Sequence, residues 1–139
     1  MVLLEELARQ DQEVFFRLFY DPVHEVFRAH WQGTLTQEEL QLAAHKGLDQ
    51  LHKYESVSFL HDHQDCLTNW QDICSWTRVM WVPKTLSSSL RYFAHLVRAE
   101  VYDNSAVQHD MVHGSVCCVH KEKSAAIQWL NEVSNKALA

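Results

Sequence analysis

The sequence predicts an α/β fold in which a β-hairpin precedes β-α units, giving a mixed, mostly parallel sheet of five strands packed with helices. Two β-rich runs on either side of Asp21-Pro22 predict the hairpin. From Thr36 onward, segments with helical periodicity alternate with short apolar runs, which is typical of right-handed β-α crossovers. With 139 residues, 47% of them hydrophobic, the chain is long enough to form one core without disulfides.

We expect one domain over residues 14–139, preceded by an N-terminal helical extension over residues 1–13. Residues 2–12 place three leucines on one side of a short amphipathic helix. This stretch carries two acids and has neither a basic segment nor an unbroken apolar one, so we do not expect a secretory signal.

The hairpin consists of the run VFFRLFY and a second run that ends at Gly33. In the second run Phe27, Ala29 and Trp31 alternate with Arg28 and a histidine, as expected for a strand with one better-buried face.

A helix begins after Thr36, because Thr36 and Glu39 form a T-x-x-E capping box. One apolar stripe then continues to about Tyr54 and consists of Leu40, Ala44, Gly47, Leu48 and Leu51.

The run SVSFL at residues 56–60 is the next strand, and a second helix begins near Thr68 or Asn69. Pro83 lacks an N–H group and disfavours helical geometry at Val82, so this helix is expected to stop or kink there. In a regular helix Trp70 and Trp81 lie nearly in line, and Trp76 is turned away from both.

The C-terminal third continues the alternation. Residues 90–99 form a strand candidate, residues 103–113 a short helix closed by Gly114, and SVCCVH another strand. The last helix begins at about Ser124 and has an apolar face.

Composition argues against nucleic acid as a partner and against a membrane span, and it indicates the cellular compartment. The net charge is −6 and no basic stripe is present, so nucleic acid is not an expected partner. No apolar run approaches the ~20 residues of a membrane span. The four cysteines show no C-x-x-C spacing, which indicates reduced thiols and a cytoplasmic protein.

Several short motifs occur in a characteristic order. They are Tyr20-Asp21-Pro22, Trp31-Gln32-Gly33, Leu60-x-Asp62, Trp70, Trp76, Trp81-Val82-Pro83, Leu90-Arg91-Tyr92 and Ala126-x-x-Trp129-Leu130. Over residues 14–135 the chain resembles bacterial small domains of the STAS-like (SpoIIAA-like) superfamily, in a branch without assigned activity. The resemblance implies the fold of anti-sigma-factor antagonists and a regulatory domain that acts through protein–protein contact. Switching members carry a phosphorylated Ser at the start of the helix after this strand, where Thr68 is the nearest hydroxyl here.

The stretch FLHDHQDCLTNW contains the candidate site. Ligands of open α/β sheets bind outside the carboxyl ends of strands, so this edge is the expected place for a ligand or partner. The residues proposed for it are Asp62, His63, Thr68, Trp70 and Trp81. A structural role for Asp62 as a cap of the following turn remains an alternative.

His61 and His63 are candidate metal ligands because they point the same way along a strand, with Asp62 opposite. Imidazole suits Zn²⁺, but a site needs three or four converging ligands, and the H-x-H pair supplies two. We therefore expect no metal or other cofactor.

The three hypotheses for function belong to different classes. The first is a non-enzymatic regulatory or scaffolding domain that contacts a protein partner or a second copy of itself. The second is a carrier of a small, lipid-like apolar ligand, and the third is a metal-dependent enzyme that uses His61 and His63. The tryptophans at 70, 76 and 81 belong to the core, to an interface or to an apolar pocket, and these alternatives stay open.

Overall fold

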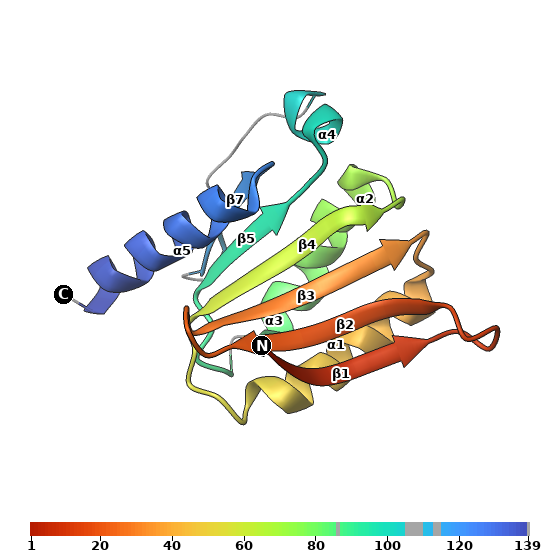
Figure 1. Ribbon diagram of the computed structural model, residues 1–139, viewed down its shortest axis with the longest axis horizontal. Helices are drawn as coiled ribbons and strands as arrows, with labels where there is room; N and C mark the ends of the chain where they lie inside the picture. Colours follow the sequence, from red (N-terminus) through yellow and green to blue (C-terminus); the bar gives the residue numbers. More distant parts are fainter. Residues whose placement is uncertain (86, 105–109, 113–114, 139) are drawn as a thin grey trace.

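The computed structural model describes residues 1–85, 87–104, 110–112 and 115–138. Within these residues, seven strands form one sheet in the order β1-β2-β3-β4-β5-β7-β6 (Figure 1). The strands are β1 (Val2–Ala8), β2 (Val14–Asp21), β3 (Val26–Gly33), β4 (Ser58–Cys66), β5 (Tyr92–Leu96), β6 (Asp110–Val112) and β7 (Ser115–His120). The helices are α1 (Gln37–Leu51), α2 (Trp70–Trp76), a π-helical turn η1 (Thr77–Trp81), α3 (Val82–Thr85), α4 (Ala99–Asn104) and α5 (Lys123–Leu138).

The predicted hairpin and parallel strands are confirmed. β2 pairs antiparallel with β3, whereas β3, β4, β5 and β7 run parallel to one another. The sheet has two more strands than the five expected, because β1 and β6 add antiparallel strands next to β2 and β7.

The predicted N-terminal helix over residues 1–13 is wrong, because residues 2–8 form β1. β1 pairs with β2 and satisfies backbone groups that would otherwise lie open at the sheet edge. Leu4 and Leu7 pack against the core from this strand. Two irregularities in the pairing and the acids Glu5 and Glu6 make the new edge a poor template for further strands.

The predicted helix over residues 103–113 is also wrong in part. α4 begins earlier, at Ala99, and residues 110–112 form β6 instead of a helix. The rest of that prediction, including the cap at Gly114, lies outside the described residues.

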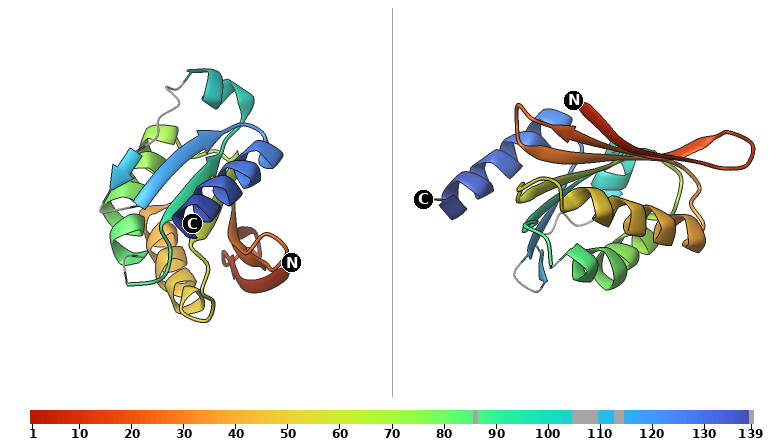
Figure 2. Two further views of the ribbon diagram at one scale, coloured as in Figure 1. Left: turned by 90° about the vertical axis from the view of Figure 1, so that its left-hand side faces the viewer. Right: turned by 90° about the horizontal axis from the view of Figure 1, so that it is seen from below.

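Helices cover both faces of the sheet (Figure 2). α1, α2, η1 and α3 lie on one face, where the larger core includes Trp31, Phe59 and Trp81. α5 packs on the other face against β4, β5 and β7, where Leu60 and Leu130 belong to a smaller core. Of the helices in the described ranges, none has both the length and the apolar character required to cross a bilayer.

The predicted capping box at the start of α1 is confirmed. The Glu39 N–H donates to Thr36 Oγ1 at 3.1 Å, and the Thr36 N–H donates to Glu39 Oε1 at 2.9 Å. Arg9 Nε also donates to Glu39 Oε2 at 2.7 Å, which ties the end of β1 to this helix start. The opening of α1 is therefore fixed by local and tertiary contacts together.

The second helix changes pitch before Pro83 and does not end there. The Val82 N–H donates to Thr77 O, five residues back, so η1 is a π-turn between α2 and α3. The wider turn relieves the contact that a proline ring makes with the carbonyl four residues earlier. It also brings Trp76 and Trp81 together, with ring centroids 5.6 Å apart, contrary to the prediction for a regular helix.

Gly47 lies in α1 directly against the Trp81 ring. A Cβ at this position would lie 3.5 Å from Trp81 Cη2 and 3.9 Å from Leu18 Cδ2, which is ordinary van der Waals contact. We expect Gly47→Ala to raise the free energy of unfolding by about 0.5–1 kcal/mol, because glycine is a poor helix former. Urea unfolding followed by circular dichroism measures this, and a loss of stability would show that the α1–Trp81 contact has no room for a methyl group.

Candidate functional site

Three buried histidines form a triangular cluster on the sheet face that α2 covers. His61 and His63 occupy alternate positions of β4, and His95 is the register partner of His61 on β5. The ring of His61 lies 4.9 Å from that of His95 and 5.7 Å from that of His63, with nearly parallel planes. His63 Nε2 and His95 Nδ1 are 3.2 Å apart and share one hydrogen bond.

Tryptophans enclose this cluster. Trp31 Nε1 donates to His61 Nδ1 at 3.2 Å, so the proton of a neutral His61 is on Nε2, which has no partner among the described residues. Trp76 and Trp81 meet the His61 ring edge to face. Trp70 packs edge-on against His63 and His95 with centroid distances of 6.1 and 5.6 Å.

Burial keeps the three imidazoles neutral. Desolvation, followed by the neighbouring imidazole charges, lowers the pKa of His61 and of His63 well below the ordinary value of 6.5. Desolvation alone lowers the pKa of His95 to about 4. The cluster therefore has donors and acceptors at neutral pH but no positive charge.

The arrangement of the rings does not favour a metal. Ring nitrogen lone pairs lie in the ring planes, and the planes of His61 and His63 stack at an angle of 9° instead of converging on one point. Over the described ranges, no group of three or more His, Cys, Asp or Glu side chains is placed to hold a metal ion.

A cavity of about 220 Å³ opens between α2 and α4, at the carboxyl ends of β4 and β5. We call it the α2–α4 cavity. The residues that define its chemistry are His63, Thr68, Asn69, Trp70, Val97 and Arg98. This is the sheet edge at which the sequence predicted a ligand.

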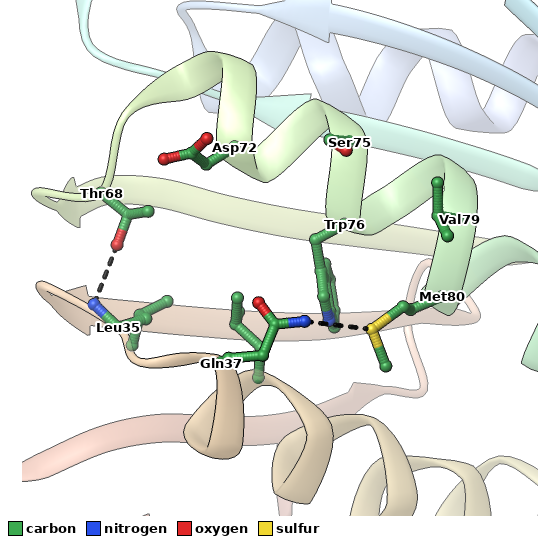
Figure 3. A pocket seen from close by; sticks show the side chains of 9 residues that line it. Leu35, Gln37, Thr68, Asp72, Ser75, Trp76, Val79 and Met80 are labelled. Carbon is green, nitrogen blue, oxygen red and sulfur yellow. Dashed lines mark hydrogen bonds between the residues drawn. The ribbon is translucent and has the colours of Figure 1, made fainter.

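A second hollow of about 380 Å³ lies on the other side of α2, towards the start of α1 (Figure 3). We call it the α1–α2 groove. Its lining includes Leu35, Leu40, Asp72, Trp76, Val79 and Met80. The side-chain amide of Gln37 donates to Met80 Sδ at 3.7 Å and spans the groove.

The five predicted site residues do not form one site. His63, Thr68 and Trp70 line the α2–α4 cavity. Asp62 points to the opposite sheet face, where its Oδ1 accepts from the Gln64 N–H at 3.0 Å, which is the structural role weighed as an alternative. Trp81 is fully buried beneath α1.

The Thr68 hydroxyl has a structural contact. Its Oγ1 accepts from the Leu35 N–H at 2.9 Å, which joins the loop before α2 to the loop before α1 (Figure 3). Both hollows share Thr68 as a lining residue. A substitution or modification of Thr68 would therefore alter the lining of both the α2–α4 cavity and the α1–α2 groove.

Two residues of this region were not predicted. His95 is the second-last residue of β5, and its contact with His61 depends on the register between β4 and β5. Arg98 follows β5 and reaches the α2–α4 cavity. The sequence signal for both was their position at the carboxyl end of a strand candidate, next to the one that contains His61 and His63.

Comparisons with known proteins add one likeness. No family model matches the chain, and a search of curated proteins found no match. Among solved structures, an uncharacterized protein of the DUF3478 family with a SpoIIAA-like fold, from Shewanella loihica, has a TM-score of 0.49 and 13% identity over 93% of this chain and 92% of its own. That protein bears the SpoIIAA-like fold name that the sequence resemblance also carries.

Proposed function

We propose that this chain is a non-enzymatic regulatory or scaffolding module that binds a protein partner through the α1–α2 groove. The observation that carries the proposal is Val79, which is 71% exposed beside the half-buried Met80 on the groove wall. Apolar side chains at the rim of a hollow between two helices are typical of a surface that receives an apolar side chain from a partner.

Charge defines the chemistry of the partner. Asp72 lines the groove, Glu38 lies in the adjacent first turn of α1, and the net charge of the chain is −6. A partner segment with an apolar anchor flanked by Lys or Arg would match both properties. The proposal therefore commits to a basic, apolar segment of another protein as the occupant.

Other surfaces support docking less well. On the sheet face opposite α1, polar side chains of β2 and β3 already have partners, as Arg17 with Glu6 at 2.8 Å and His30 with Asp65 at 2.7 Å. The histidine cluster is enclosed and neutral, and we propose no catalytic role for it. A cytoplasmic location belongs to the same proposal and accords with the thiols of Cys66 and Cys74.

The test compares two exposed valines. Val79 lies on the groove, and Val23, which is 84% exposed, lies in the β2–β3 turn. Because both side chains are mostly exposed, replacing either valine by lysine removes a similarly small amount of buried apolar surface. Peptides are selected from a displayed random library on the wild-type chain, and their affinities for both variants are measured by calorimetry. We expect apolar-basic peptides whose affinity falls about tenfold or more with Val79→Lys, because an anchor contact is lost and a like charge is added.

Val23→Lys is expected to leave the affinity unchanged. Selected peptides that bind both variants equally, or that are acidic, would contradict the proposal. Light scattering on the same samples reports self-association. A dimer that Val79→Lys dissociates would show that the groove receives a second copy, which would overturn the commitment to another protein.

A further inference from the structure

We propose that the α2–α4 cavity binds a small amphiphilic carboxylate. Among the lining residues of the two hollows only Thr68 is shared, and this inference does not depend on the proposal for a protein partner. The cavity lies at the carboxyl ends of two neighbouring parallel strands, the position at which open α/β sheets bind ligands.

The polar groups of the cavity favour an anion. Arg98 is a lining residue, and none of the described lining residues is Asp or Glu. The Asn69 side-chain oxygen caps the Gln71 N–H at 2.8 Å, which leaves its NH₂ group as a donor. The Thr68 oxygen accepts from a backbone N–H and keeps its own O–H as a donor. One cation and two neutral donors match a carboxylate.

The remaining wall is apolar and sets the size of the ligand. Trp70, Ile73, Val97 and Val101 contribute side chains from both helices and the end of β5. The volume of about 220 Å³ is below the roughly 300–1,000 Å³ of cavities for drug-sized ligands, so a single ring or a short branched chain is the largest body that fits.

His63 gives a second, independent indication of a ligand. Its side chain is 5% exposed and lines the cavity, and its Nδ1 has no hydrogen-bond partner among the described residues. A buried polar atom without a partner is costly, and such atoms are few in native proteins. Because the other ring nitrogen of His63 shares a hydrogen bond with His95, Nδ1 can act as donor or acceptor according to the tautomer. A polar ligand atom that reaches it past Trp70 would recover that hydrogen bond.

The Arg98 guanidinium is available to a ligand because its present partner is weak. Arg98 Nε lies 3.4 Å from Glu100 Oε1, and these side chains are 38% and 67% exposed. Exposed ion pairs of this length contribute little to stability. A ligand carboxylate inside the cavity would compete with Glu100 for the same guanidinium, so removing the Glu100 charge should strengthen binding.

The experiment uses benzoate, phenylacetate and cyclohexanecarboxylate as probes, with benzamide as the neutral isostere of benzoate. Binding to the full chain is followed by NMR of the tryptophan indole N–H groups, with the Trp70 resonance assigned through Trp70→Phe. Three variants are compared with wild type: Arg98→Gln, Glu100→Gln and Arg17→Gln. The last is the matched control, because Arg17 also belongs to an exposed ion pair but lies on β2.

We expect at least one carboxylate to shift the Trp70 resonance in a saturable way, and benzamide to bind at least tenfold more weakly. Arg98→Gln should weaken carboxylate binding about tenfold or more, Glu100→Gln should strengthen it a few-fold, and Arg17→Gln should leave it unchanged. The proposal is overturned if no carboxylate shifts Trp70, if benzamide binds as well as benzoate, or if Arg98→Gln and Arg17→Gln bind alike.

Discussion

Lowering the pH from 7 to 5 is expected to reduce the free energy of unfolding by about 5 kcal/mol, which is comparable to the whole stability of a typical domain. His61, His63 and His95 are buried and neutral, and each has a native pKa below the ordinary value of 6.5. In the unfolded chain each imidazole binds a proton as the pH falls below about 6.5. The unfolded state then binds more protons than the native state, so stability falls with falling pH.

The directions of these pKa shifts determine whether stability rises or falls with pH and over which pH range it changes. The contribution of the cluster is complete above pH 6.5 and declines as the pH falls towards about 4, where native His95 also becomes protonated. Each histidine contributes up to about 1.4 kcal/mol per pH unit in this window. The carboxylate Asp21 acts at lower pH, because its native pKa is about 2 and its ordinary value is 3.8.

Urea unfolding at pH 7.5, 6.5, 5.5 and 5.0, followed by tryptophan fluorescence, measures this dependence. His95→Gln should reduce the slope of stability against pH by about a third, since one of three titrating groups is gone. His45→Gln, at an exposed ring on α1, is the matched control and should keep the wild-type slope. A stability that is flat between pH 7 and 5 would mean that the three imidazoles are not enclosed as described.

The parts of the fold that could be predicted are those that depend on local chemistry. Thr36 and Glu39 form their capping box within four residues, and Asp21-Pro22 forms a turn between two β-rich runs. The alternation of Phe27, Ala29 and Trp31 also placed the better-buried face of β3 correctly. In each case the decisive contacts lie within a few residues along the chain.

β1 could not be predicted in the same way. The spacing of its leucines suits one side of a short helix as well as an edge strand, and only the free edge of β2 decides between them. The π-turn is a second example. Pro83 indicated a disturbance, but the pitch that brings Trp76 against Trp81 depends on Val82 donating five residues back to Thr77.

The candidate site was predicted in part for the same reason. Strand alternation placed His61 and His63 on one face and Asp62 on the other, which is a local property of β4. The contact with His95 requires the register between β4 and β5, which is set by long-range pairing. Trp81 was included in the candidate site because a regular helix places it nearly in line with Trp70, whereas the structure buries it in the core.

Asp21→Asn is expected to lower the free energy of unfolding by about 3 kcal/mol, because it leaves a largely buried cation unpaired. Asp21 is 5% exposed, and its Oδ2 accepts from Arg28 at 2.5 Å and contacts His24 Nδ1 at 2.8 Å. Burial alone would raise the pKa of Asp21, but the hydrogen bonds from the ring and backbone of His24 and the charge of Arg28 lower it to about 2. The carboxylate is therefore charged at neutral pH. Urea unfolding of the wild type and of Asp21→Asn at pH 7 measures the loss of stability.

The matched control is Asp65→Asn. Asp65 also pairs with a basic side chain, His30, at 2.7 Å, but it is 65% exposed, so we expect a loss below about 1 kcal/mol. The double variant Asp21→Asn with Arg28→Met separates charge from packing. If the cost of Asp21→Asn comes from the unpaired guanidinium, whose Nε has no partner among the described residues, the double variant should lose less than the sum of the single variants. Additive losses would instead assign the effect of Asp21 to its backbone hydrogen bonds with Val23 and His24.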